Sequence, residues 1–297
     1  MAHKSRYLKW IKKNSMDEKI GFIGAGAMGA SMAEAILNAG LFTPDRMMAA
    51  DIDRERLFSL EKKLGIQTAP DARTLFSLCR VVVLAVKPQV LDGVLRDIAS
   101  AKDYEIKDEK LALSIAAGAV LSRIEHILYA PLDDRARSRL PIVRAMPNTP
   151  ALVSRGMSGM CANRHATAAH REKARAILES MGRCLEFDEK DMDAVTAVSG
   201  SGPAYVFYMA DAMIRAGADI GLDPGAAAGL TIQTFRGAAA LMEKTGEPPR
   251  TLMARVMSPG GTTEAAVKEL DRAGVDEKMG RAVRAAFERS RELAGGS

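Results

Sequence analysis

Residues 20–29 read "IGFIGAGAMG", a short apolar run that leads into glycines spaced G-x-G-x-x-G. Gly24 permits a tight turn, Gly26 lets the backbone approach a pyrophosphate, and Gly29 lets a helix pack closely on a strand. Bare N–H groups and the dipole at the start of that helix favour negative charge. Because a strand pattern precedes the glycines and a helix pattern follows them, the stretch predicts dinucleotide binding. A merely structural glycine turn is the alternative.

The segments that follow continue the alternation of strand and helix. Apolar runs typical of strands occupy 19–24, 46–51, 81–88, 111–118, 142–150 and 156–162. Amphipathic helical patterns occupy 27–40, 53–65 and 170–182. This pattern predicts an α/β fold with a Rossmann-like, doubly wound parallel sheet.

The pattern changes after "RCLEFDEKD". From Met192 onward the chain shows only Ala-rich helical segments punctuated by Gly and Pro. We therefore expect a dinucleotide-binding domain at 16–188 and an all-helical domain at 189–297. Helices with such small apolar side chains have little to bury alone, so we expect them to pack against a second subunit.

The positive charge of the chain is concentrated in a basic arm at residues 1–15. Its five cations equal the whole formal charge of +5, so the body of the chain nets zero; they are Lys4, Arg6, Lys9, Lys12 and Lys13. We interpret the arm as a tag or an over-extended start before Met16; a targeting segment, or a tail that touches nucleic acid or membrane, is the alternative. For the body we expect no nucleic-acid partner.

The composition points to a protein of the cytoplasm. No run of eighteen apolar residues occurs, so no membrane span is expected. The three cysteines are isolated, and neither they nor the four histidines have metal-ligand spacing. We expect no metal site and a reducing, cytoplasmic setting.

Two charged residues after the second strand bear on the choice of cofactor. Asp51 ends that strand 22 residues after Gly29, where an acid usually accepts hydrogen bonds from the adenine ribose. A carboxylate there favours NADH because it repels a 2′-phosphate. Arg54 could instead bind such a phosphate, or it could be a solvated helix start. The choice between NADPH and NADH stays open.

Two further strand ends carry polar residues. In "AVKPQV", Lys87 either faces the nicotinamide pocket or is a solvated loop lysine, and Pro88 stops the strand. In "MPNTP", two prolines stiffen a loop that can hold Asn148 and Thr149 against the nicotinamide side. A rigid connection without a ligand is the alternative for this loop.

Glycine-rich helix starts recur outside the nucleotide-binding half. "SGSGPAYVF" (199–207) predicts an exposed helix N-terminus with Ser201 or Gly202 at the cap, and "SPGGTTEAAV" (258–267) predicts another. Together they could hold a small carboxylate with backbone amides. Ordinary helix caps are the alternative, but the glycine density favours close approach to a ligand.

From about Lys19 to its end the chain resembles the pyrroline-5-carboxylate reductase family. The resemblance rests on the ordered motifs "GFIGAGAMG", "AVKP", "SIAAG", "RAMPNTPA", "DAVTAVSGSGPAYVF", "TGE" and "SPGGTTEAAV". It implies a Rossmann domain followed by a helical dimerisation domain that interlocks with its partner in a homodimer, in some members assembled further into rings of dimers. It also implies reduction of the C=N bond of 1-pyrroline-5-carboxylate to L-proline with NADPH or NADH, the final step of proline biosynthesis.

The resemblance assigns roles to particular residues. It implies that Ser258, Gly260, Gly261 and Thr262 grip the substrate carboxylate. It places Thr263 beside the ring nitrogen as the catalytic hydrogen-bonding group. From the glycine-rich helix start at 199–203 we also expect Ser201 in the substrate site. The residues expected at the cofactor are Gly24, Gly26, Ala27, Met28, Gly29, Asp51, Arg54, Ala85, Val86, Lys87, Pro88, Ala117, Pro147, Asn148 and Thr149.

The residues that are missing agree with imine reduction. An alcohol dehydrogenase needs a base such as His or Lys, and no well-placed histidine is present. A protonated cyclic imine accepts hydride directly, so orientation can carry much of the catalysis. A related imine or hydroxy-acid dehydrogenase, or a nucleotide-binding protein without catalysis, is the alternative. The chain departs from the family pattern at Pro248, where a histidine is common, and at Ala254, where an acid is common.

Overall fold

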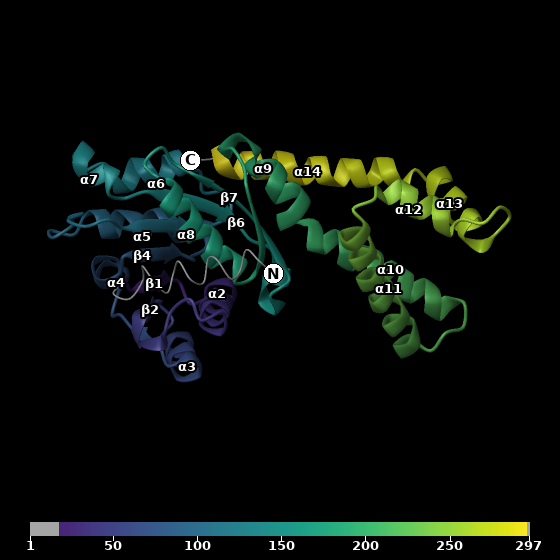
Figure 1. The fold of residues 1–297 in the computed structure, drawn as a ribbon, viewed down its shortest axis with the longest axis horizontal. Coiled ribbons are helices and arrows are strands. Elements are labelled where there is room, and N and C mark those ends of the chain that lie inside the picture. Colours follow the sequence, from purple (N-terminus) through teal and green to yellow (C-terminus); the bar gives the residue numbers. More distant parts are fainter. Residues whose placement is uncertain (1–17, 296–297) are drawn as a thin grey trace. The chain divides into compact units, whose positions relative to one another are not determined.

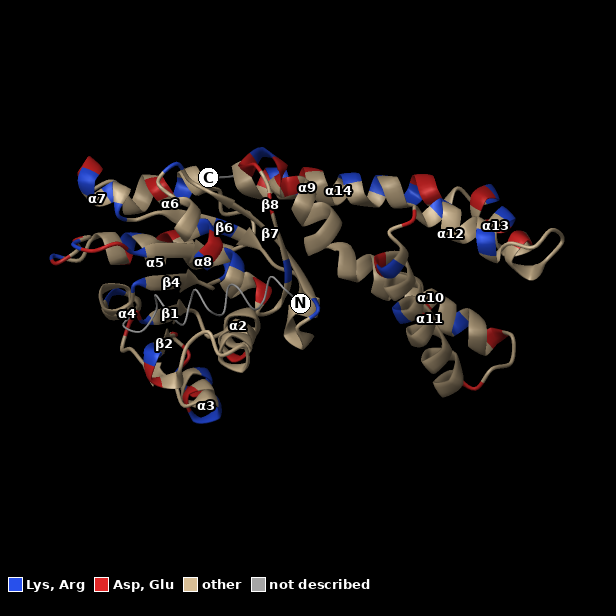
Figure 2. Ribbon diagram, in the orientation of Figure 1, with Lys and Arg blue, Asp and Glu red and all other residues tan. Residues whose placement is uncertain are grey.

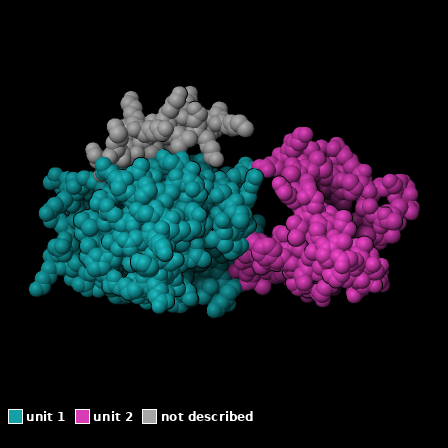
Figure 3. Space-filling model, turned by 90° about the horizontal axis from the view of Figure 1, so that it is seen from below, with its two compact units in different colours: residues 1–200, 287–297 teal, residues 201–286 magenta. Residues whose placement is uncertain are grey.

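The computed structural model describes residues 18–295, so the basic arm lies outside the described residues. The chain divides into two compact units (Figures 1 and 3). The first runs to Gly200 and takes in the end of the last helix from Phe287 onward, and the second is Ser201–Ala286. No helix of the described residues is both long and apolar enough to cross a membrane.

The first unit is built on an eight-stranded sheet. Its order is β3-β2-β1-β4-β5-β6-β7-β8, and the strands are β1 (Ile20–Ile23), β2 (Met47–Ala50), β3 (Gln67–Thr68), β4 (Val81–Leu84), β5 (Leu111–Ser114), β6 (Ile142–Met146), β7 (Gly156–Ala162) and β8 (Gly182–Glu186). Neighbouring strands are parallel except for β6 and β7, which are antiparallel. The predicted doubly wound sheet is confirmed, with a correction at this pair.

The antiparallel pair follows from the connection between its strands. A parallel connection needs a crossover of a dozen or more residues. Here the chain passes through the short 3₁₀ helix η2 (Thr149–Val153) and reverses at Ser154, which takes a left-handed backbone with φ of 55°. The chain can then only return beside β6 in the opposite direction.

Helices cover both faces of the sheet (Figure 1). The helices of this unit are α2 (Ala27–Asn38), α3 (Arg54–Leu64), α4 (Ala72–Leu78), α5 (Pro88–Ala99), α6 (Leu121–Leu128), α7 (Asp134–Ser138), α8 (Ala168–Glu179) and α9 (Met192–Val195), with the 3₁₀ helices η1 (Pro44–Arg46) and η3 (Glu189–Asp191) and the π-helix η4 (Thr196–Gly200). Alternate residues of the strands enter two buried clusters: Phe22 packs with α2, α3 and α8, whereas Ile23 packs with α4, α5 and α6. Burial on both faces explains the continuous apolar strands.

The second unit contains only helices, as the sequence after Met192 predicts. It comprises α10 (Gly202–Asp219), α11 (Pro224–Thr245), α12 (Pro249–Val256), α13 (Thr262–Arg272) and α14 (Val275–Gly295) up to Ala286. α10 packs on α11, and Gly217 faces Ala227 there so closely that an added Cβ would lie 3.1 Å from the alanine Cβ. Small residues let these two helices approach each other.

Candidate cofactor and substrate sites

The glycine turn between β1 and α2 is fixed by close packing at its first and last glycine. Gly24 has φ of 103°, and a Cβ there would lie 2.7 Å from the backbone oxygen of Ala85. A Cβ on Gly29 would clash with the backbone oxygen of Gly24. The first glycine therefore serves the turn and the third serves helix–strand packing.

Gly26 is different, because its surroundings leave room above the turn. A Cβ at Gly26 would meet no atom within 4 Å, and its φ of −65° is open to any residue. Gly26 is also the N-cap of α2, and no side chain caps that helix start. Neither folding nor packing requires a glycine there, so the residue fits a pyrophosphate that approaches the backbone and the bare N–H groups of α2.

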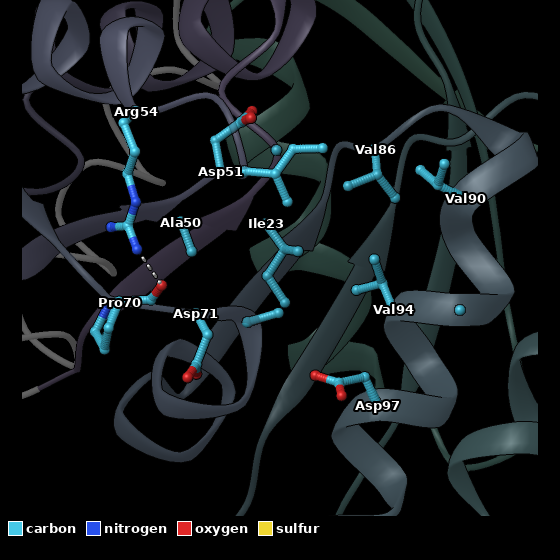
Figure 4. A pocket seen from close by; sticks show the side chains of 14 residues that line it. Ile23, Ala50, Asp51, Arg54, Pro70, Asp71, Val86, Val90, Val94 and Asp97 are labelled. Carbon is cyan, nitrogen blue, oxygen red and sulfur yellow. Dashed lines mark hydrogen bonds between the residues drawn. The ribbon is translucent and has the colours of Figure 1, made fainter.

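A cavity of about 500 Å³ opens beside this turn (Figure 4). It lies at the carboxyl ends of β1, β2 and β4, the edge at which open α/β sheets bind ligands. The lining residues are Ile23, Gly24, Ala50, Asp51, Ile52, Arg54, Pro70, Asp71, Ala72, Val86, Val90, Gly93, Val94 and Asp97. The position and size of the cavity suit the adenosine half of a dinucleotide.

Asp51 supports the glycine turn in addition to facing the cavity. Its Oδ2 accepts the N–H of Ala25 at 2.6 Å, and its Oδ1 accepts the N–H of Asp53 at 2.9 Å. Arg56 Nη1 lies 3.6 Å from Oδ2, and the Asp51 side chain is only 8% exposed. Its negative charge is thus partly compensated before any ligand binds, which weakens the repulsion expected toward a 2′-phosphate.

Other predicted cofactor residues lie at the same edge of the sheet. Arg54 lines the cavity and donates from Nη2 to the Pro70 oxygen at 3.4 Å, whereas Val86 lines its opposite side (Figure 4). Lys87 is exposed and is not among the lining residues; it is the N-cap of α5. Pro88 starts α5 at its first position, so it begins a helix where the sequence predicted only the end of a strand.

The loop 146–150 holds Asn148 by both ends of its amide. Its Nδ2 donates to the Ser199 oxygen at 3.1 Å, and its Oδ1 accepts the N–H of Met157 at 2.9 Å. The side chain therefore joins β6, β7 and the segment before α10. Thr149 begins η2 directly after it, and Pro147 precedes it. The amide predicted to face nicotinamide is engaged with the protein itself.

The predicted helix start is confirmed, with Ser201 as the N-cap of α10, but Ser201 is not preceded by an extended segment. The π-helix η4 ends at Gly200, and Ser201 has helical backbone angles and makes no capping hydrogen bond through its side chain. The start of α10 therefore directly follows a π-helical turn in the sequence. Pro203 lies in the first turn of α10, as predicted. π-Helical turns are frequent at functional sites.

In the second unit, residues 258–263 form a glycine turn at the start of α13. Gly260 has φ of 73°, Gly261 is the N-cap, and Thr262 and Thr263 are the first helical residues. The Gly260 N–H donates to Glu264 Oε2 at 2.6 Å. Lys268 and this N–H lower the pKa of the Glu264 carboxyl group. In the chain by itself the N–H of Gly260 is thus engaged by a carboxylate of the helix that follows the turn.

The two positions that depart from the family pattern lie just before this turn. Pro248 is the N-cap of α12, and Ala254 lies within that helix. Arg255 of the same helix pairs with Glu247 at 2.6 Å.

One ion pair was not predicted from the sequence, that of the buried Arg144 with the partly exposed Glu189. Arg144 Nη1 lies 3.2 Å from Glu189 Oε1, and Arg144 is 3% exposed on β6. A lone arginine inside an apolar strand pattern was the available signal, because a buried charge requires a partner.

Comparison with known proteins identifies both parts of the chain. The family model for pyrroline-5-carboxylate reductase dimerisation matches residues 189–293, and the model for NADP oxidoreductase, coenzyme F420-dependent, matches residues 19–118. Among curated relatives, the pyrroline-5-carboxylate reductase of Pseudomonas aeruginosa is 40% identical over 93% of this chain and 97% of its own. That of Corynebacterium melassecola is 37% identical over 92% of this chain and 98% of its own.

Solved structures agree over the same length. The pyrroline-5-carboxylate reductase from Coxiella burnetii matches with a TM-score of 0.82 and 33% identity, covering 93% of this chain and 98% of that one. The enzyme of Plasmodium falciparum with NADP bound matches with a TM-score of 0.80 and 29% identity, covering 94% and 98%. The chain belongs to the pyrroline-5-carboxylate reductase family.

Proposed function

We propose that this chain reduces 1-pyrroline-5-carboxylate to L-proline by hydride transfer from NADPH or NADH, the final step of proline biosynthesis. Family membership gives the reaction. The observation in the molecule that supports it most is the turn at 258–263, where the N–H of Gly260 donates to a carboxylate, that of Glu264. A substrate carboxylate would take the same kind of hydrogen bond.

The first unit would hold the cofactor. The open space above Gly26 and the bare start of α2 suit the pyrophosphate, and the cavity bounded by Asp51 and Arg54 suits the adenosine. The loop that holds Ala117 follows β5, farther along the same sheet edge than the cavity, and would lie on the nicotinamide side. NADPH or NADH, when bound there, supplies the hydride.

The second unit would hold the substrate. Ser258, Gly260, Gly261 and Thr262 would bind the carboxylate, and Thr263 would hydrogen-bond to the ring nitrogen. The protonated imine already carries the positive charge that attracts hydride, and addition to the C=N carbon leaves the nitrogen as an amine. No side chain must remove a proton from carbon or oxygen, so catalysis can rest on orientation.

A homodimer is the assembly that we propose. The family model that matches 189–293 is one for dimerisation, and the helices of 201–286 leave large apolar side chains exposed. A ring of such dimers would appear as a multiple of the dimer mass. We place the enzyme in the cytoplasm, in keeping with its three free, buried cysteines.

The role of Thr263 is open to a direct test. Thr263→Ala should lower kcat about tenfold or more because the hydrogen bond to nitrogen is lost, while the Kd of NADPH stays within about twofold. The matched control is Thr234→Ala on α11, where the hydroxyl donates only to the Leu230 oxygen of the same helix. Equal losses in kcat and cofactor affinity, with an intact dimer, would contradict this role.

A further inference from the structure

The loop 115–120 joins β5 to α6 at the ligand edge of the sheet. The Ile115 N–H donates to the Leu84 oxygen of β4 at 3.1 Å, so the loop starts beside the strand that packs against the glycine turn. The cavity proposed for the adenosine is lined by residues at or after β1, β2, β3 and β4 and by none from this loop, which follows β5, one strand farther along the sheet. The loop is therefore on the side left for the nicotinamide. Whatever fixes the loop fixes one wall of the reacting half of the cofactor site.

A residue far along the chain fixes the end of this loop. Leu121, the first residue of α6, donates its N–H to Glu189 Oε1 at 2.6 Å, across 68 residues. The N-cap, Val120, has no polar side chain and cannot satisfy this group. A carboxylate at a helix start is favourable both as a hydrogen-bond acceptor and toward the helix dipole.

The same carboxylate oxygen is held from a second direction. Arg144 Nη1 lies 3.2 Å from Glu189 Oε1, and Arg144 is buried on β6 opposite Ser114, the last residue of β5. A buried guanidinium without its partner would be costly. Arg144 and the N–H of Leu121 therefore hold the Glu189 carboxylate close to Ser114, where the loop leaves the sheet.

The segment that carries Glu189 is tied to the last helix as well. Ser290 Oγ of α14 donates to Asp193 Oδ1 at 2.6 Å, and Ser290 is buried. On the loop itself, a Cβ at Gly118 would lie 3.5 Å from Leu293 Cβ. The end of α14 thus contacts both the loop and the segment 189–193 that holds it.

We propose that Glu189 is a positioning residue for the hydride-transfer reaction: through the start of α6 and through Arg144 it fixes loop 115–120 against the nicotinamide half of the cofactor, and α14 supports it through Asp193. The nicotinamide side of the claim rests on the proposed function. Glu189 contacts neither reactant. Its effect is confined to the part of the cofactor that lies beyond the pyrophosphate.

Two ligands that differ only in the nicotinamide end separate this role from general stabilisation. In the intact full-length protein, Glu189→Gln should raise the Kd of NADPH about fivefold by calorimetry and leave that of 2′-phospho-ADP-ribose within about twofold. NADH and ADP-ribose form the equivalent pair if the protein prefers NADH. Amide hydrogen exchange should become faster in peptides that cover 115–124, with or without ligand. Ser290→Ala should give the same pattern more weakly, and it serves if Glu189→Gln does not fold.

The control is Glu186→Gln, which removes a carboxylate on β8 that pairs with Arg171 and Arg175 but does not touch the loop. In this variant the Kd of NADPH, the Kd of 2′-phospho-ADP-ribose and the hydrogen exchange of 115–124 should all stay as in the wild type. Equal weakening of both ligands, unchanged exchange in the loop, or the same changes in the control would overturn the proposal, as would wild-type protein that binds neither ligand. Wild-type protein that binds NADPH but does not reduce the pyrroline would contradict the proposed function alone, because the binding and exchange tests would still decide the role of Glu189.

Discussion

The two units of this chain differ in how far they bury their apolar side chains. In the first, two clusters of buried residues fill the space on either face of the sheet, and strand residues such as Phe22 and Val83 are fully buried. In the second, residues 201–286, only Ala227 and Thr231 are buried. Phe207, Tyr208, Leu230 and Ile232 are each more than half exposed. One unit has its own core, and the other does not.

The difference indicates that the apolar side chains of the second unit are to be covered by a second chain. Long stretches of α10 and α11 carry no charge (Figure 2), although their large apolar side chains are exposed. Apolar surface on that scale marks a protein–protein interface. The glycine turn for the cofactor therefore belongs to the unit that has its own core, whereas the turn proposed for the substrate belongs to the unit that lacks one.

The largest effect should come from a charge on the exposed apolar surface of the second unit. Leu230→Glu should convert the dimer to monomer and lower activity at least about tenfold, because a carboxylate buried without a partner is costly. Light scattering gives the mass, and hydrogen exchange should become faster across 201–286. Phe58→Glu on α3 adds the same charge at an apolar side chain that is 65% exposed in the first unit, and it should remain a dimer. A dimeric, fully active Leu230→Glu protein would remove the distinction between the units.

Within the first unit, the three glycines should divide into structural and ligand-binding positions. Gly26→Ala should weaken NADPH binding about tenfold or more with Tm within about 2 °C of wild type, since its Cβ meets no protein atom. Gly24→Ala should lower the free energy of unfolding by about 1–3 kcal/mol, because alanine is strained at φ of 103°. Calorimetry of unfolding and of binding checks both. A loss of stability in Gly26→Ala equal to that in Gly24→Ala would contradict the division.

A smaller effect is expected at Asp51. Asp51→Ser should shift the NADPH/NADH ratio of kcat/KM about threefold toward NADPH, less than for a free carboxylate because Arg56 and two N–H groups already compensate the charge. Both cofactors should bind less tightly, since the turn at Ala25 loses its support. Asp53→Ser removes a carboxylate outside the cavity while serine can still cap α3, and it should leave the ratio unchanged. An unchanged ratio in Asp51→Ser would show that Asp51 has no part in cofactor choice.

No effect is expected on the reactivity of the three cysteine thiols when the dimer is lost. Burial raises the pKa of Cys79 to about 11 and those of Cys161 and Cys184 to about 12. All three lie in the first unit. At pH 8 they should react slowly with a disulfide reagent, and equally slowly in the Leu230→Glu variant, because loss of the partner leaves the first core intact. Fast labelling in that variant would mean that the first unit also depends on the dimer.

The sequence was sufficient to predict those parts of the fold that depend on residues close together in the chain. The glycine turn, the apolar strands and the helical second half each depend on neighbouring residues, and all were predicted. The direction of β7 depends on a left-handed Ser154 that no pattern marks. The π-helix Thr196–Gly200 directly before Ser201 is likewise not marked by any local pattern. Glu189 caps a helix 68 residues away, and only the folded sheet brings the two together.

The proposed reaction is tested most directly by the absorbance of NADPH and of NADH with two substrates, 1-pyrroline-5-carboxylate and 1-pyrroline, which lacks the carboxylate. We expect rapid oxidation of at least one cofactor with the first substrate. With the second substrate kcat/KM should be about a hundredfold lower, because the turn at 258–263 then has no anion to hold. Equal rates with both substrates would contradict the role of that turn. No oxidation with either substrate, by protein that binds the cofactor, would contradict the reaction itself.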